Sequence, residues 1–556
     1  MQNFSKLCLI AGVVGLSACV AEPPNSAFEL PVSQKASLEA ASQAQTAEAR
    51  IEADIAYLAS DFRQGREAGT EAYEEAARYV AGRFASLGLE PGADGKWLQP
   101  VPLRSVQRDL DVAAMTIKTA AGDTHTLTHL DDYIIGRSIA EPSFNVSAPV
   151  IFVGYGVSAK EEGHDDYATI DVQGKIVAVF GGAPSSFNSE KLAFYRSTDN
   201  KVKTAAAHGA VGLIILPTTS QLARRPWDRV AAGASSASMT WVHPDGVGDV
   251  SSRQLQASAF MGPTGAAKLF ADMPLTFTEL QTRQDEDLPM EAFALNKTVT
   301  LNGASSFEEK TSSNVVGFLK GSDPALANEV LVLTAHLDHV GVHETRSGGN
   351  DHIHNGALDN AMGVAMMLDV AAKFQGGPAP KRSILFLAVT AEEKGLLGSD
   401  YFAHYPSVKA DRIVANVNLD MPLMLYPFID VIAFGAERSS LGPVVSEAAS
   451  SMGVALIPDP IPEQGIFTRS DHYRFVEKGV PSVFLFNGFG NGGGEIFSNF
   501  MASHYHQPSD DINQPIMYDQ AARFAELNYR IARRIADSPD RPTWNEGDFF
   551  GDKFGR

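Results

Sequence analysis

Five ionisable side chains in the second half of the chain stand where apolar segments end or begin. Such groups are costly beside a hydrophobic core unless something binds them. The five are His336, Asp359, Glu393, Asp420 and His506. Imidazole and carboxylate ligands without a thiolate suit zinc or another divalent first-row ion. Because one catalytic zinc needs three protein ligands, five residues predict two ions that share one carboxylate.

The segments around these residues have the pattern of alternating strands and helices. Continuous apolar runs predict strands at 329–337, 382–390, 412–420 and 481–487, and helical spacing predicts helices at 361–374 and 517–538. This alternation is typical of a mostly parallel sheet covered by helices on both faces. Ligands of such folds bind beyond the carboxyl ends of the strands. We therefore expect the five side chains to meet at one edge of the sheet.

The segment "TAHLDHVGV" (334–342) places two histidines and an aspartate at the end of one strand. Residues two apart in a strand share a face, so His336 and Asp338 point the same way and His339 the other. We expect Asp338 to hold the second ring nitrogen of His336 and so to orient this ligand. His339 is predicted to be packed or solvated, and His352 and His354, in a loop rich in Gly and Asn, to bind no metal.

The middle of the chain has a different character. Short apolar strands separated by turns resemble the protease-associated (PA) domain, notably in "VGYGV", "YATIDVQGKIVAVF" and "KVKTAAAHGAVGLIIL". The alternative is an unrelated small β-rich insertion. No group of acid, base and nucleophile occurs here. We expect a module that shapes access to a site elsewhere.

The motifs of the second half resemble, in order, those of the di-zinc exopeptidases of peptidase family M28. They are "TAHLDHVG", "HNGALDNAMGVAMMLDVA", "TAEEKGLLGS", "NLDM", "RSDHYRF" and "YHQPSDD". The resemblance extends over about 48–540 and is greatest to the subgroup with an inserted PA domain. It implies the α/β zinc-exopeptidase fold, a mostly parallel mixed sheet between helices. The family often has a second Asp where this chain has Asn360, a position that is not a metal ligand.

The resemblance also implies a role for each candidate ligand. His336 and Asp420 would hold one zinc, and Glu393 and His506 the other. Asp359 would bridge the two ions, with a cis peptide bond to Asn360. In total the chain would carry two zinc ions.

Glu392 is implied as the general base and then the general acid. A water bound between two cations loses its proton near neutral pH, and Glu392 lies beside a ligand. Tyr505 is our candidate donor to the oxyanion, and the alternative is a core tyrosine. Asp471 and His472 would touch substrate or support the ligands. The Gly-rich segment 487–495 is predicted to be a flexible loop.

The N-terminus has the pattern of an export signal. A short polar start and a brief apolar stretch precede "LSAC", which resembles a lipoprotein box with Cys19 as the lipidated residue. The alternative is a plain signal peptide cut near Ala18. The only other cysteine, Cys8, lies in the removed segment, so no disulfide is expected. We predict an exported protein anchored by lipid to a bacterial membrane, the outer membrane facing the periplasm if the source is Gram-negative.

These patterns predict seven segments. They are a signal peptide (1–18), a tether (19–36), an N-terminal part of the peptidase domain (37–144), the PA insertion (145–265), a connecting segment (266–294), the catalytic domain (295–540) and a tail (541–556).

The function these residues favour is a metal-dependent exopeptidase that removes N-terminal residues from peptides. The alternatives are a carboxypeptidase, with Arg469 as the one basic candidate for a substrate carboxylate, a glutaminyl-cyclase-like enzyme with one zinc, or a non-catalytic binding protein. Serine and cysteine hydrolases are disfavoured because the chain has neither a G-x-S-x-G motif nor a free thiol after export. The net charge of −21 argues against nucleic acid as a partner. The oligomeric state is left open.

Overall fold

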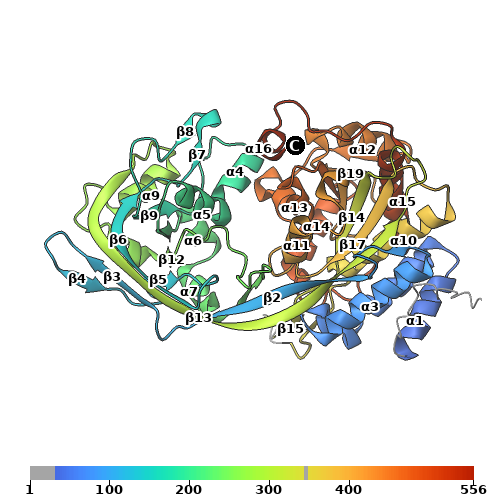
Figure 1. Cartoon of the computed structure of the whole chain (residues 1–556), viewed down its shortest axis with the longest axis horizontal. Coiled ribbons are helices and arrows are strands. Elements are labelled where there is room, and N and C mark those ends of the chain that lie inside the picture. The colour runs from blue at the N-terminus through green and yellow to red at the C-terminus, as the bar shows by residue number, and fades with distance from the viewer. Residues whose placement is uncertain (1–31, 344–348, 556) are drawn as a thin grey trace, which may run out of the picture.

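The computed structural model describes residues 32–343 and 349–555. The chain forms two lobes, joined at one side by the long strands β2 (Leu98–Arg108) and β13 (Phe293–Leu319) (Figure 1). The opposite sides of the lobes meet through α4 (Ser189–Arg196) and the C-terminal segment (Figure 1). In the described part of the chain, no helix has the length and apolar character needed to span a bilayer. Cys19 and the predicted signal lie outside the described residues.

The catalytic lobe, residues 305–555 with the N-terminal helices, is built on a mixed sheet. Its centre has four parallel strands, β17 (Ser383–Val389), β14 (Val330–His336), β18 (Ile413–Leu419) and β21 (Ser482–Asn487), in that order. Antiparallel strands flank them, the C-terminal half of β13 beside β17 and β19 (Asp430–Phe434) beside β21. The mostly parallel sheet predicted from the apolar runs is confirmed.

Helices cover both faces of this sheet, which explains why its strands are apolar at every position. Leu331 and Leu333 of β14 pack on the face of α10 (Met362–Gly376) and α15 (Tyr518–Asp537). Val330 and Val332 face the opposite layer, with Phe402 of α11 (Leu397–His404) and Phe475 of α13 (His472–Val476). All seven residues of β14 are buried.

The N-terminal segment completes the first of these layers. It forms α1 (Val32–Gln43), α2 (Ala47–Leu58) and α3 (Glu71–Ser86), with a short break between α1 and α2. The break falls at Thr46, whose side chain accepts a hydrogen bond from Ala49 N and starts α2. A buried ion pair between Asp54 and Arg83, with Oδ1 to Nε at 2.7 Å, ties α2 to α3.

The second lobe is larger than the predicted insertion at 145–265. Its sheet includes β3 (Ala114–Lys118), β5 (Tyr133–Ile135), β6 (Ser143–Phe152), β9 (Ile176–Phe180), β10 (Gly212–Leu216), β12 (Ala257–Met261) and the first half of β13. One core runs from Met115 to Leu301. Segments on both sides of the predicted insertion therefore pack with it.

The link between the lobes is a single strand of 27 residues. Thr298–Ala304 of β13 pair with β6, and Ser305–Val315 pair with β2 in the next stretch. The final residues of the strand then join the catalytic sheet beside β17. Since β2 pairs with β13 along eleven residues, the connection is a two-stranded ribbon rather than a loop.

Candidate metal centre

A first group of metal-binding side chains lies at the carboxyl edge of the catalytic sheet. His336 is the last residue of β14, and Asp420 follows the last residue of β18. The Nε2 atom of His336 lies 3.0 Å from Asp420 Oδ1 and 3.3 Å from Asp359 Oδ1. These three buried residues have ligand atoms close enough to hold one metal ion.

A second group shares Asp359 with the first. His506 Nε2 lies 3.2 Å from Asp359 Oδ2 and 3.1 Å from Glu393 Oε2. The two oxygens of Asp359 therefore face different groups, Oδ1 the first and Oδ2 the second. Although it is buried between two carboxylates, His506 Nε2 forms no hydrogen bond. A nitrogen placed in this way fits a ligand whose lone pair is directed at a shared cation.

His339 is packed, as predicted, and its ring also lies within the second group, which the sequence analysis did not foresee. Its Nδ1 lies 2.8 Å from Glu393 Oε1 and 3.7 Å from Asp359 Oδ2, and its ring is fully buried. The alternation of side chains assumed that the strand continues, but β14 ends at His336. Beyond that point the chain turns, with His339 N bonded to Arg66 O.

Asp338 contacts the second ring nitrogen of His336, as predicted, but the prediction that its carboxylate makes this contact is wrong. The group that meets His336 Nδ1, at 3.1 Å, is the backbone carbonyl of Asp338 and not its carboxylate. The buried carboxylate instead accepts hydrogen bonds from the backbone N–H groups of Glu392, at 3.0 Å, and Glu393, at 3.2 Å. Asp338 thus orients the ligand His336 through its main chain and fixes the Glu392–Glu393 segment through its side chain.

The loop that carries Asp359 is held by buried polar groups. The peptide bond from Asp359 to Asn360 is cis, as the resemblance implied. Asp510 accepts hydrogen bonds from Leu358 N (2.9 Å) and Asp359 N (3.0 Å). Asn360 Oδ1 accepts from Gly363 N and Met421 N, and its amide donates to Leu419 O. Asn360 therefore ties the bridging residue to the segment of Asp420 and contributes no ligand.

Arg66 is a buried cation that the sequence analysis did not identify. Its guanidinium donates to four main-chain carbonyls, those of Leu337, Leu58, Asn355 and Gly356. Asn355 and Gly356 lie in the loop before Asp359, and Leu337 follows His336. Burial lowers the pKa of Arg66 to about 10, a change that nearby carboxylates oppose. At neutral pH it remains charged and fixes the two ligand-bearing segments relative to one another.

Glu392 lies in neither group but lines the adjacent pocket together with His336 and Asp359. Burial raises the pKa of Glu392 well above its usual range, and the carboxylates of Glu393 and Asp420 add to this effect. Bound dications would act in the opposite direction by stabilising the ionised form. A carboxyl group in such surroundings can take up and release a proton near neutral pH.

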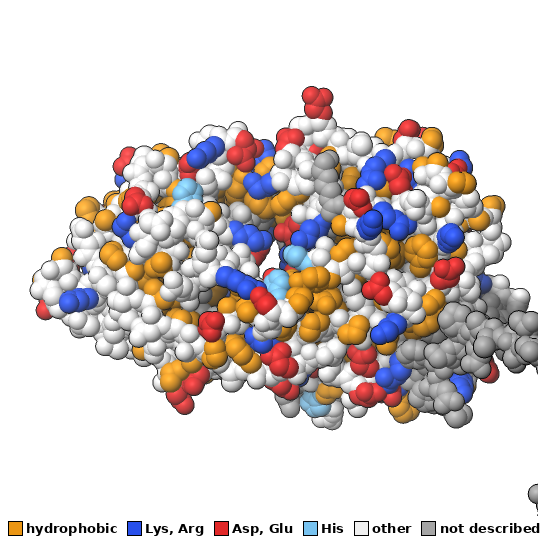
Figure 2. Space-filling model, in the orientation of Figure 1, with side chains coloured by type: hydrophobic (Ala, Val, Ile, Leu, Met, Phe, Trp, Pro, Cys, Tyr) orange, Lys and Arg blue, Asp and Glu red, His pale blue; other side chains and the backbone are white. Residues whose placement is uncertain are grey.

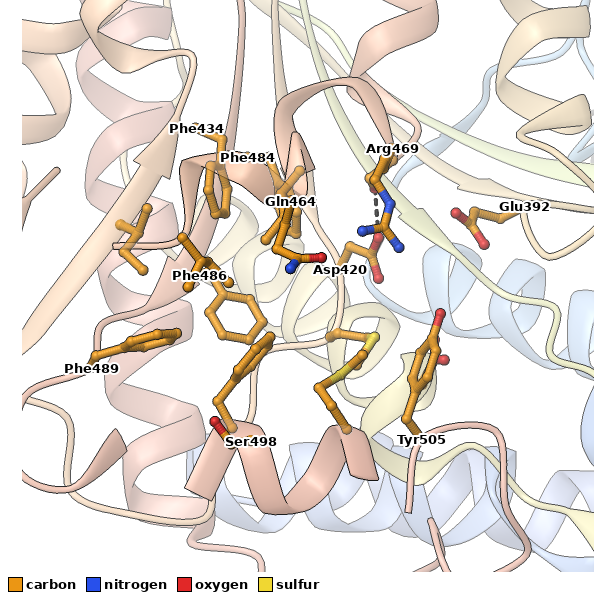
Figure 3. A pocket seen from close by; sticks show the side chains of 18 of the residues that line it. Glu392, Asp420, Phe434, Gln464, Arg469, Phe484, Phe486, Phe489, Ser498 and Tyr505 are labelled. Carbon is orange, nitrogen blue, oxygen red and sulfur yellow. Dashed lines mark hydrogen bonds between the residues drawn. The ribbon is translucent and has the colours of Figure 1, made fainter. Parts of the chain in front are cut away.

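The pocket beside the two groups has a volume of about 420 Å³. Figure 3 shows that its far wall is aromatic, with Phe434, Phe484, Phe486 and Phe489, while Glu392, Asp420, Arg469 and Tyr505 lie at the other end. The hydroxyl of Tyr505 points from the wall toward this polar end (Figure 3). Its ring stacks on His506, with 3.8 Å between centroids. Burial raises the pKa of Tyr505 far above the neutral range, so the hydroxyl stays protonated and can donate.

Other residues considered from the sequence lie outside the pocket wall. Asp471 and His472 are fully buried behind it, next to Ser470, which donates to Asp420 Oδ2 at 2.6 Å. His352 and His354 are in neither metal group. The Gly-rich segment 487–495 is a loop only in part, because α14 (Gly493–Ser503) begins within it and Gly490 N bonds to Asp430.

The donor set fits divalent cations. Three carboxylates and three imidazoles supply the two groups, no thiolate is present, and one carboxylate faces both. Further acids surround them, since Asp338, Asp510 and Asp471 are also fully buried. Two dications would offset this concentration of negative charge, which a single buried guanidinium cannot do.

Part of the chain is similar to known proteins. Residues 314–532 match the model of peptidase family M28. The chain is 30% identical over 239 residues to a probable leucine aminopeptidase 2 of Aspergillus oryzae, covering 42% of this chain and 45% of the relative. It is 34% identical over 132 residues to aminopeptidase YwaD of Bacillus subtilis, covering 24% and 26%. The chain spans about half the length of the curated relatives it matches.

Among solved structures, an aminopeptidase from Aneurinibacillus sp. strain AM-1 aligns over 91% of this chain and 97% of its own. The TM-score is 0.49 and the sequence identity 19%.

Proposed function

We propose that this chain, whose residues 314–532 match the model of peptidase family M28, is an aminopeptidase that uses two zinc ions. The observation that carries the proposal is that the two carboxylate oxygens of Asp359 face different groups of ligands. Its Oδ1 lies 3.3 Å from His336 and its Oδ2 lies 3.2 Å from His506. A carboxylate that presents one oxygen to each group is the arrangement that a pair of neighbouring metal ions requires.

The metal ions would activate a water molecule near neutral pH and polarise the scissile carbonyl. Glu392, which lines the pocket without joining either group, would accept the proton of the attacking water and deliver it to the leaving amine. Tyr505 would donate a hydrogen bond to the oxygen on which negative charge develops. Asp338 would keep Glu392 in place through the backbone N–H that it accepts.

The aromatic end of the pocket favours an apolar N-terminal residue as the part of the substrate that is recognised. Phe434, Phe484, Phe486, Phe489 and Phe497 line it. A pocket of about 420 Å³ with such a wall suits an apolar side chain. Two of the relatives that match the chain are named leucine aminopeptidase 2, which agrees with an apolar preference.

The rival functions are less well supported. A glutaminyl-cyclase-like enzyme needs one zinc, whereas two groups of ligands are present. A non-catalytic binding protein would not need a half-buried Glu392 beside them. A carboxypeptidase needs a cation that holds the substrate's terminal carboxylate. Arg469 lines the pocket, so this alternative has a structural basis and must be tested.

We also propose that the second lobe is a PA domain that restricts access to the pocket. Its closeness to the pocket supports this role, because α4 packs against the segment 462–468 of the catalytic lobe. Export and attachment to a membrane through a lipid on Cys19 complete the proposal and rest on the N-terminal sequence.

The test is a panel of substrates assayed with and without chelator. Leucine and phenylalanine anilides should be cleaved, the same compounds with a blocked amine should not, and chelation should abolish turnover until zinc is restored. Release of C-terminal residues from amine-blocked peptides would instead assign a carboxypeptidase.

A further inference from the structure

Three arginines converge in the cleft between the lobes, next to the catalytic pocket. Arg196 ends α4 and Arg224 ends α6 (Thr219–Arg224), both in the second lobe, whereas Arg469 belongs to the catalytic lobe. Figure 2 shows Lys and Arg side chains on both sides of the opening between the lobes. This concentration of positive charge contrasts with a chain whose net charge is −21. We call these three residues the arginine cluster.

The arginine cluster has no acidic partner among the described residues. None of the three guanidinium groups forms an ion pair or a side-chain hydrogen bond there. A neighbour shows the contrast, since Arg438 contacts Glu190 at 2.8 Å and Asp548 at 3.0 Å. The charged groups that act on the half-buried Arg196 are Arg224 and Arg469, and with burial they lower its pKa. Arg196 is half-buried, whereas Arg224 and Arg469 are exposed, so the cluster offers one partly desolvated cation and two solvent-accessible ones to an anion.

The cluster is continuous with the catalytic pocket. A Cβ atom on Gly465 would lie 3.4 Å from Arg196 Nη2, so this guanidinium rests against the segment 461–469. The same segment supplies Ile461, Gln464, Ile466 and Arg469 to the wall of the pocket that holds Glu392 and Asp420. On its other side, Arg196 lines a second cavity of about 440 Å³ with Arg224 and Arg225. A path lined by guanidinium groups thus leads from the pocket to the second lobe.

We propose that the arginine cluster binds the C-terminal carboxylate of short peptide substrates. This inference rests on the proposed aminopeptidase function and names its substrate class, which is free oligopeptides. An N-terminal residue in the pocket leaves the rest of the peptide to extend past Arg469 toward Arg196 and Arg224. Guanidinium groups bind carboxylates through paired, charge-assisted hydrogen bonds. The second lobe would thereby select peptides by length, because only a peptide of the right number of residues spans the distance from the pocket to the arginine cluster.

The test compares peptides that differ only in the terminal charge. The substrates are Leu-Gly, Leu-Gly-Gly and longer members of this series, each as the free acid and as the C-terminal amide. We expect kcat/KM of the wild-type enzyme to favour the acid roughly tenfold or more at one or two lengths, the ratio that charge-assisted hydrogen bonds support. At other lengths the ratio should approach one.

The variants Arg196→Gln and Arg224→Gln should reduce this ratio toward one, and Arg196→Lys should retain part of it. Turnover of leucine anilide, which has no carboxylate, should stay at the wild-type level in all three, which shows that the fold is intact. Arg253→Gln is the matched control, because Arg253 lies in the same lobe and pairs with Asp245 at 2.8 Å. It should leave every ratio unchanged.

The peptide amide Leu-Gly-Glu-amide carries a side-chain carboxylate but no terminal one, and so distinguishes the two sources of a carboxylate. The inference is overturned if acid and amide are cleaved equally at every length, or if only the glutamate side chain raises kcat/KM. Failure of the wild-type enzyme to cleave leucine anilide would instead refute the proposed function itself.

Discussion

Replacing His339 should weaken zinc binding at the second group and leave the first group intact. The side chain is fully buried, its Nδ1 lies 2.8 Å from Glu393 Oε1, and its Nε2 has no hydrogen-bond partner. The substitution His339→Phe keeps a ring of similar size against His506, whose centroid is 5.4 Å away. It removes both ring nitrogens, Nδ1, which faces Glu393, and Nε2, which has no hydrogen-bond partner. The change therefore tests the chemistry of the residue more than its packing.

The expected magnitude follows from the contact with a ligand. Loss of a group that holds a metal ligand typically costs 10- to 100-fold in affinity, which is about 1.4–2.7 kcal/mol. If His339 binds the metal directly, the loss is larger, because the ion then loses a ligand and not only its orientation. Since the buried Nε2 makes no hydrogen bond, removal of that atom should cost little stability.

The assay is a titration of zinc into the metal-free protein in competition with a chromogenic chelator. His336→Phe and His506→Phe assign the two binding steps, because these residues belong to different groups. His208→Phe is the control for the substitution itself. His208 stacks on Tyr167 in the second lobe and should not affect either step. The reasoning would be refuted if both zinc-binding steps of His339→Phe had the wild-type affinity, or if only the step assigned to the group of His336 were weakened.

Three further predictions concern the base, the pocket and the acid limit of stability. Glu392→Gln should lower kcat by about 10²–10⁴-fold, the usual contribution of general acid–base catalysis, with unchanged zinc content by mass spectrometry; a loss of zinc would contradict its assignment as base. Phe486→Ala should raise KM for phenylalanine anilide more than for alanine anilide, and an equal change would argue against recognition of the N-terminal side chain here. Burial alone would raise the pKa of Asp400, but hydrogen bonds from His404 and Trp241 bring it down to about 2. The ionised Asp400 therefore contributes about 2 kcal/mol to the free energy of unfolding above pH 4, and this contribution is lost as the pH falls toward 2. Denaturant unfolding should show that Asp400→Asn is destabilised at pH 7 and much less so at pH 2.5. An equal loss of stability at both pH values would contradict the assignment.

The meeting of the metal-binding residues could be predicted from the sequence because it depends on one regular feature. Parallel strands end at the same edge of a sheet, so His336 and Asp420, each at a strand end, had to lie close together. The apolar runs identified those strands because helices cover both faces. The pairing of Asp359 with both groups came from the resemblance, and the structure brings the same residues together.

What the sequence did not predict lies where the chain leaves regular structure or depends on distant partners. The place of His339 beside the second group was missed because the alternation of side chains ends with β14, three residues before it. Arg66 contacts carbonyls more than 270 residues away, and no local pattern indicates such a contact. The limits of the second lobe were set too narrowly because β13 belongs to both lobes, so no composition change marks the boundary.

The central claim is that two zinc ions lie between these groups and share Asp359. The most direct test is the zinc stoichiometry of the purified wild-type chain after dialysis against zinc-free buffer, measured by mass spectrometry against protein concentration. We predict two zinc ions per chain. A value of one per chain in a fully active enzyme would contradict the claim.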